Sequence, residues 1–253
     1  MRTWRLALGL LATAVLSVSP WPSALPVARA AEDHAAQAHQ LITVTAESVR
    51  SRIAEVRWYE RLADEPWRLV AGPVRARLGW AGLTPAQARR QDSGMTPMGV
   101  FTIQEGFGRF ANPGTRLPYR RIDRNDAWTF DARVPSTYNL FQDVPRSWRA
   151  YGDDVEILWE HGIQYRYVAV IDFNRPPGPV TVGRNGVRRS AVPADVRKGG
   201  GIFLHVDDGQ ATAGCVAIPE AAMRRVLSWL DPQAHPAIVI GTQQTVEATL
   251  HGS

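Results

Sequence analysis

The chain has 253 residues, of which 45% are hydrophobic and 21% are charged, which is enough for one sizeable core. Its single cysteine excludes an internal disulfide and marks that thiol as a candidate reactive group. The net charge of +5 falls to about +2 without the three arginines of residues 1–30, so charge gives no indication of a nucleic-acid partner.

Residues 1–30 have the pattern of a secretory signal peptide. Arg2 and Arg5 supply the positive start, residues 6–18 are apolar, and residues 28–30 read Ala-Arg-Ala, a small-residue cleavage site. The apolar core is short for a membrane span, although an uncleaved anchor is the alternative. We therefore expect an exported protein, in the periplasm or in the cell wall and extracellular space, with no stable membrane span after cleavage.

The remainder predicts one mainly β domain over residues 41–245, after a polar, alanine-rich and loosely ordered segment at 31–40. Short runs rich in β-branched and aromatic residues predict strands. These runs cover residues 41–45, 53–59, 67–70, 74–78, 100–104, 155–159, 165–173, 202–205 and 237–240. A short helical turn is predicted at 84–90, and an amphipathic helix at 219–230.

Two predictions concern the middle of the chain. Residues 155–159 and 165–173 are expected to pair as a hairpin, which would place His161 in its turn and away from catalysis. Residues 106–138 are poorly periodic, and long loops of this kind often bind ligands. One hypothesis is that the aromatic rings of this stretch wall a substrate groove, and the alternative is that they pack the loop onto the sheet. The rings concerned are Phe107, Tyr119, Trp128 and Tyr138.

The strongest candidate for chemistry is the glycine-rich stretch 199–219. Its apolar run 202–204 predicts a buried strand that ends at His205, and Gly214 places Cys215 on a turn. In acyl transfer a cysteine thiolate attacks a carbonyl while an imidazole accepts and returns the proton. We therefore predict Cys215 as nucleophile, His205 as base, and the N–H groups of Gly214 and Cys215 as oxyanion donors.

Two other interpretations fit the same residues. Cys215 can be a small buried hydrophobic residue beside a structural histidine. Alternatively, His205, Asp207 and Asp208 can form a metal site, although no second histidine or cysteine stands at ligand spacing.

The segment TAGC at 212–215, with His205 upstream at a strand end, resembles the signature of the L,D-transpeptidase catalytic-domain (YkuD-like) family. Four further stretches, in the same order, are similar to that family. They are MTPMGVFTI at 95–103, DAWTFDARVPSTYN at 126–139, YRYVAVIDFNRPPGP at 165–179 and LSWLDPQAHPAIVIGT at 227–242. The usual motif is Ser/Thr-His-Gly-Cys with a later Arg or Asn, whereas this chain has Ala213 and Ala217 at those places, and Val206 where glycine is usual.

The resemblance implies a single β-sandwich-type domain with few short helices. It implies an enzyme that attacks peptidoglycan stem peptides through Cys215, forms an acyl-enzyme and transfers the acyl group to an amine, which crosslinks the wall. It implies no metal and no organic cofactor. Two alternatives stay open: an L,D-carboxypeptidase that hydrolyses the same bond, and a peptidoglycan-binding module without catalysis. Neither the residues nor the resemblance predicts an oligomeric state.

Overall fold

The computed structural model describes residues 34–62, 65–143 and 151–251, so the predicted signal peptide lies outside the described residues. Strands are the commonest regular secondary structure in the described residues. The N-terminal strands are β1 (Gln40–Ala46), β2 (Ile53–Glu60), β3 (Arg68–Arg77), β4 (Leu83–Pro85) and β5 (Thr96–Gly108). The central strands are β6 (Tyr119–Arg121), β7 (Ala127–Thr129), β8 (Leu140–Gln142), β9 (Val155–Ile157) and β10 (Val168–Ile171). The C-terminal strands are β11 (Val180–Val182), β12 (Arg188–Ser190), β13 (Phe203–Val206), β14 (Val216–Ile218) and β15 (Ala237–Thr242).

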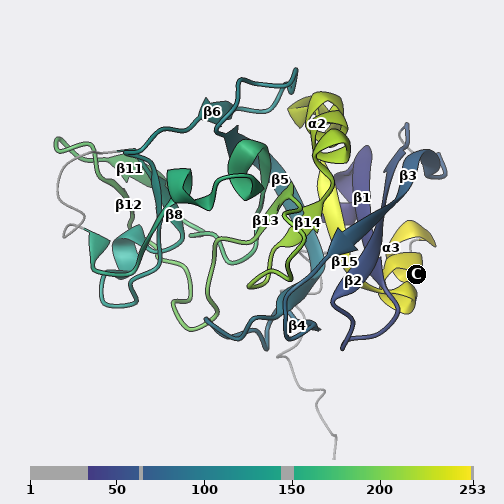
Figure 1. Cartoon of the computed structure of the whole chain (residues 1–253), viewed down its shortest axis with the longest axis horizontal. Coiled ribbons are helices and arrows are strands. Elements are labelled where there is room, and N and C mark those ends of the chain that lie inside the picture. Colours follow the sequence, from purple (N-terminus) through teal and green to yellow (C-terminus); the bar gives the residue numbers. More distant parts are fainter. Residues whose placement is uncertain (1–33, 63–64, 144–150, 252–253) are drawn as a thin grey trace, which may run out of the picture.

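The main sheet curves until it meets itself. Its strand order is β10-β13-β14-β3-β2-β1-β15-β5-β4, with β6 added beside β5. Strand β5 is long enough to serve two neighbours: residues 99–102 pair with β15, and residues 103–107 pair with β10. Because β10 also pairs with β13, the pairings return to their starting strand. In Figure 1 these strands extend from the centre, where β5, β13 and β14 lie, to β1, β2 and β3 at the right.

The interior of this sheet is filled by apolar side chains from nearly every strand and by one helix. Helix α2 (Glu220–Trp229) was predicted from its apolar stripe, and Met223, Val226 and Leu227 are buried in the core. Helix α3 (Gln243–His251) covers the opposite face of β1 and β15 with Val246. This second cover explains why β1 is buried along almost its whole length. None of the helices in the described ranges is long and apolar enough to cross a membrane.

A second core lies beside the main sheet, at the left in Figure 1. It is formed by residues of β7 and β8, by residues of the main-sheet strands β5, β10 and β13, and by loops, and it is rich in aromatic rings. Phe107 and Trp128 lie in this core, Tyr138 is fully buried nearby, and Tyr119 packs against the main core. The groove-wall hypothesis for these four rings is therefore wrong, because they pack the loop onto the sheet.

The predicted hairpin of 155–159 with 165–173 is also wrong. Strand β9 pairs with β7, whereas β10 pairs with β13 and β5. Two 3-10 turns, Leu158–His161 and Gln164–Arg166, separate the strands, and the Leu158 side chain is fully buried in the aromatic core. Leu158 therefore anchors the segment between the two strands in the aromatic core.

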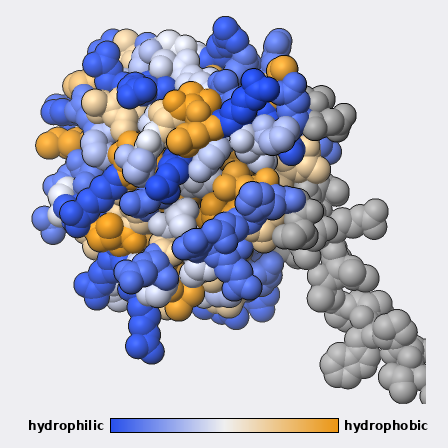
Figure 2. Space-filling model, turned by 90° about the vertical axis from the view of Figure 1, so that its right-hand side faces the viewer, coloured by the Kyte–Doolittle hydropathy of each residue, from blue (hydrophilic) through white to orange (hydrophobic). Residues whose placement is uncertain are grey.

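The helical turn predicted at 84–90 is shorter than expected. Thr84 and Pro85 belong to β4, and the helical turn is reduced to the carbonyl of Pro85, which accepts hydrogen bonds from the N–H groups of Ala88 and Arg89. Figure 2 shows the side of the molecule on which β3 and α3 lie in Figure 1. Hydrophobic residues there form small patches between hydrophilic ones, an ordinary pattern for a protein surface.

Candidate active site

The predicted nucleophile and base come from two adjacent parallel strands. Strand β13 carries His205, which lies opposite Ala217 of β14. Cys215 directly precedes β14, and its Sγ accepts a hydrogen bond from the N–H of Phe203 at 3.3 Å. The pairing of β13 with β14 therefore brings together Cys215, just before β14, and His205, within β13. Both side chains line one pocket.

This pocket has a volume of about 490 Å³ and lies between the main sheet and the aromatic core. It is lined by segments that are far apart in the sequence. Its charged and ionisable lining residues are Arg89, Asp92, Asp154, Glu156, His161, Tyr165, His205 and Cys215. Its aromatic and glycine lining residues include Trp80, Phe130, Gly199, Gly200 and Gly201.

Cys215 is half-buried and holds its proton in this setting. Its Sγ donates to the carbonyl of Gly201 at 3.3 Å while it accepts the N–H of Phe203. Burial raises the pKa of the thiol to about 12, against the lowering effect of the Phe203 N–H and of Arg89. At neutral pH the residue is therefore a thiol whose proton must be taken by a neighbouring base before it can attack.

His205 is only 3% exposed and is neutral at the same pH. Burial lowers the pKa of its imidazole to about 4, although a hydrogen bond to Val206 opposes this lowering. Its Nδ1 lies 2.9 Å from the carbonyl oxygen of Val206, which can only accept, so Nδ1 carries the proton. Nε2 is then left with a lone pair, which is the form a general base requires.

The two aspartates that follow His205 do not orient it. Asp207 forms an ion pair with Arg77, with both carboxylate oxygens within 3.1 Å of Nε, and Asp208 accepts from the amide of Gln164. The backbone carbonyl of Val206 orients the imidazole instead. In the described ranges, no three side chains of His, Cys, Asp or Glu are grouped so that they could hold a metal ion.

The turn before Cys215 is held by Thr212. Its hydroxyl donates to the carbonyl of Cys215 at 2.7 Å and accepts the N–H of Gly214 at 3.1 Å. Gly214 has φ +140°, and a Cβ there would lie 2.9 Å from the carbonyl oxygen of Met95, so no other residue fits. The Gly214 N–H, predicted to stabilise an oxyanion, therefore already has a partner.

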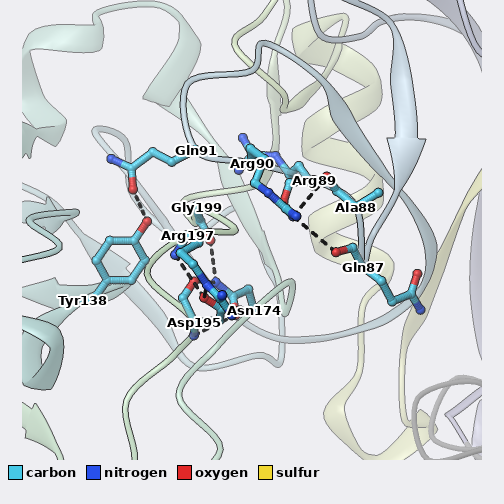
Figure 3. A network of polar contacts seen from close by, with 10 residues as sticks. All are labelled: Gln87, Ala88, Arg89, Arg90, Gln91, Tyr138, Asn174, Asp195, Arg197 and Gly199. Atoms are coloured by element: carbon cyan, nitrogen blue, oxygen red, sulfur yellow. Dashed lines mark hydrogen bonds and ion pairs between the residues drawn. The ribbon is translucent and has the colours of Figure 1, made fainter. Parts of the chain in front are cut away.

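A buried amide holds the glycine run that faces the thiol. The Oδ1 of Asn139 accepts the N–H of Gly201 at 2.9 Å, and its Nδ2 donates to the carbonyls of Phe173 and Asn174. Asn174 in turn donates to the carbonyl of Gly199 at 2.7 Å, a contact drawn in Figure 3. The carbonyl that accepts the Cys215 proton is thus fixed from two sides.

Sequence reasoning missed a second polar group in the pocket. The Tyr165 hydroxyl donates to Oε1 of Glu156, and Nε2 of His161 lies 3.1 Å from the same oxygen. Burial raises the pKa of Glu156, and the ring of Tyr165 meets the ring of His205 edge-on at 5.8 Å. His161 lies in a turn, as predicted, but it also lines the pocket beside the predicted base.

These features define a class of protein: a closed, sheet-rich domain with a cysteine and a neutral histidine in one pocket. The model of the YkuD family, the L,D-transpeptidase catalytic domain, matches residues 67–242. The chain therefore belongs to this family, as the sequence motifs predicted. No curated protein matches the chain.

Proposed function

We propose that this protein is an exported L,D-transpeptidase that acts on peptidoglycan stem peptides through an acyl-enzyme on Cys215. The observation that carries the proposal is the pairing of β13 with β14, which places the Cys215 thiol and the neutral His205 imidazole in one pocket. The match to the L,D-transpeptidase catalytic domain supports the substrate class. The pattern of residues 1–30 supports export.

The first half of the proposed reaction acylates the enzyme. His205 Nε2 takes the thiol proton, and Sγ of Cys215 attacks the carbonyl carbon of the L,D-peptide bond. The resulting oxyanion is stabilised by backbone N–H groups, with Cys215 N–H the first candidate because the Gly214 N–H is bound to Thr212. The C–N bond then breaks, and the terminal D-alanine leaves with the proton carried by His205.

The second half transfers the acyl group to an amine. The amine nitrogen attacks the thioester carbonyl, His205 removes the extra proton from nitrogen, and the C–S bond breaks to return the thiol with that proton. Three carboxylates line the pocket, those of Asp92, Asp154 and Glu156. Such a lining favours an amine-bearing acceptor over a purely neutral one, which supports transfer rather than hydrolysis.

Two measurements test the proposal on the purified protein without residues 1–30. In the first, a carbapenem is added and the intact mass is recorded. We expect a covalent adduct that maps to Cys215 and is absent from Cys215→Ala. In the second, a stem tetrapeptide is supplied with and without an amine acceptor, and the products are identified by mass. Transfer predicts a crosslinked product and released D-alanine.

The outcomes separate the alternatives. Release of D-alanine with a tripeptide product, even when acceptor is present, would identify a carboxypeptidase. Binding to isolated peptidoglycan with neither adduct nor product would identify a wall-binding module and contradict the proposal. The exposed His235 provides a control, because His235→Asn should keep the adduct that His205→Gln slows. Export is tested by N-terminal sequencing of the secreted protein, which should begin at Ala31.

A further inference from the structure

Arg89 is a buried cation whose side chain donates hydrogen bonds to backbone carbonyls. It is 4% exposed, its Nε donates to the carbonyl of Met95 at 3.1 Å, and its Nη1 donates to the carbonyl of Lys198 at 2.6 Å. Its guanidinium carbon lies 5.5 Å from the centre of the Phe173 ring. No carboxylate of the residues that the structure describes forms an ion pair with it. A buried charge of this kind is costly unless an anion balances it.

The guanidinium lies between the two glycine segments that frame Cys215. A Cβ on Gly199 would lie 2.1 Å from Nη1, and a Cβ on Gly214 would lie 3.0 Å from Nη2. Nη2 is the nitrogen that binds neither the Met95 nor the Lys198 carbonyl. Figure 3 shows Arg89 on the segment 87–91, with Gly199 close by. Arg89 lines the same pocket as Cys215, so the uncommitted nitrogen is next to the residue that precedes the thiol.

A positive charge on Arg89 and a negative charge on Cys215 stabilise each other. Burial lowers the pKa of Arg89, and negative charge at Cys215 opposes that lowering. Conversely, Arg89 lowers the pKa of Cys215, whereas Glu156 raises it. Asp92 also attracts Arg89, but it is exposed and therefore screened by water. Ala213 and Ala217, two residues to either side of Cys215, have no polar side chain that could stabilise this negative charge.

We propose that Arg89 is the counter-ion for the negative charge that forms at Cys215, first on the thiolate sulfur and then on the oxygen of the tetrahedral intermediate. The inference rests on the proposed function only in taking Cys215 as the nucleophile. The guanidinium is already in place before the charge develops, so no reorganisation accompanies the reaction. Backbone carbonyls of two segments hold Arg89 in place. Its role is to stabilise the negative charge, and it does not take or return the proton.

The first test measures the thiol without any substrate. The rate of alkylation of Cys215 by iodoacetamide is followed from pH 7 to 9 in wild type, Arg89→Gln and Arg89→Lys. Below the thiol pKa this rate is proportional to the thiolate fraction. We expect Arg89→Gln to slow alkylation about tenfold or more at each pH, since removing a nearby cation shifts a pKa by about one unit or more. Arg89→Lys should retain most of the wild-type rate.

Arg61 provides the matched control. Like Arg89, it donates to backbone carbonyls, those of Ala38, Ala35 and Ala36, but it does not line the pocket. Arg61→Gln should lower the melting temperature and leave the alkylation profile unchanged. The other ionisable groups that face the pocket stay the same in all variants, so the difference belongs to Arg89. They are Asp92, Asp154, Glu156, His161, Tyr165 and His205.

A second test leaves Arg89 intact in case its variants do not fold. Cys215→Asp places a carboxylic acid, which ionises near pH 4, where the thiolate forms, and Cys215→Asn is its neutral match. If Arg89 is the counter-ion, the stability of the Asp variant relative to the Asn variant rises as pH increases through about 4. A relative stability that falls over the same range would mean an unbalanced carboxylate and would overturn the proposal.

One further result would overturn it. Unchanged alkylation in Arg89→Gln, together with a raised KM for the stem peptide, would place Arg89 on a carboxylate of the substrate. Neither the alkylation test nor the stability test requires turnover. If both succeed while no transfer or hydrolysis is found, the counter-ion stands and the proposed function fails.

Discussion

At the scale of single residues, the pocket holds a thiol and an imidazole that are both neutral. The pKa of Cys215 is raised to about 12 and that of His205 is lowered to about 4, in each case mainly by burial. Charge therefore forms on the two residues together, when the proton moves from sulfur to nitrogen. This makes the groups that fix their geometry, above all Thr212 and the Val206 carbonyl, important for the rate.

The first residue-scale prediction concerns Thr212. Thr212→Val keeps the shape of the side chain but removes the hydroxyl that joins the Gly214 N–H to the Cys215 carbonyl. We expect the acylation rate by a carbapenem to fall roughly tenfold, since a loosened turn misplaces the nucleophile. The loss of two hydrogen bonds should also lower the free energy of unfolding by about 1–3 kcal/mol. Stopped-flow acylation and denaturant unfolding measure the two effects.

Thr212→Ser distinguishes a positioning role from a packing role. Serine restores the hydroxyl without the methyl group, so it should recover most of the acylation rate. If serine is as slow as valine, the hydroxyl has no part in positioning the nucleophile and the methyl group accounts for the effect.

At the scale of elements, Asn139 joins three segments around the pocket. Its amide accepts from the Trp128 indole at 2.8 Å and from the Gly201 N–H, and it donates to the carbonyls of Phe173 and Asn174. Asn139 is 1% exposed and has φ +57°, a conformation that asparagine adopts more readily than most residues. All four hydrogen-bonding sites of the amide are satisfied, so the side chain ties loop to strand at a fixed distance.

Asn139→Asp should be strongly destabilising for this reason. The substitution keeps the shape but replaces an NH₂ group that faces two carbonyl oxygens with a carboxylate oxygen. We expect the free energy of unfolding to fall by about 3 kcal/mol at neutral pH, from two lost donors and a buried unpaired charge. Denaturant unfolding monitored by tryptophan fluorescence measures it. Asn125→Asp, at an exposed turn, is the matched control and should change stability by less than about 0.5 kcal/mol.

The strands were largely predictable because their signal is local. Alternating or continuous apolar residues identified β1, β2, β13 and β15, and the three-and-four spacing identified α2. Which strand pairs with which depends on residues that are far apart in the sequence. The hairpin prediction failed because β9 and β10 are close in sequence but find partners elsewhere. Helix α3 was missed because its amphipathic pattern is weak, with Val246 its only buried residue among those described.

The candidate site, like the strands, was predictable where its residues are close together in the sequence. Cys215 and His205 were found because both lie in one short stretch with glycines at the turn. Arg89 and Glu156 were missed because each reaches the pocket from a distant segment. The hydrogen bond of Arg89 to Lys198 spans 109 residues, and no pattern within either segment predicts it. A buried arginine gives a sequence signal only when its partners are known.

At the scale of the whole molecule, closure of the sheet places the pocket between two separate cores. Strand β5 contributes Ile103 to the main core and Phe107 to the aromatic core, so one strand joins the two. His205 lies on β13, whose residues Leu204 and Phe203 point into the main core and the aromatic core respectively. Changes in the charge of His205 should therefore affect the stability of the entire domain.

The last prediction concerns acid stability. The pKa of His205 is lowered to about 4, below the 6.5 that is usual for an exposed histidine, so the unfolded chain binds more protons between these pH values. Stability should therefore fall as pH decreases from about 6.5 to 4. The shift corresponds to a loss on the order of 3 kcal/mol from this residue alone. Melting temperatures from pH 7 to 4 measure the trend in wild type and in His205→Gln.

The difference between the two proteins isolates the histidine. Burial raises the pKa of Glu156 and of Asp172. Their protonation therefore adds to the stability of the folded protein as pH falls, which is opposite to the effect of His205. Because both are present in wild type and in His205→Gln, their contribution cancels in the comparison. His235→Asn, at an exposed position, should follow the wild-type curve. If His205→Gln loses as much stability on acidification as wild type, the imidazole is not buried in its neutral form, and its proposed role as a base loses its physical foundation.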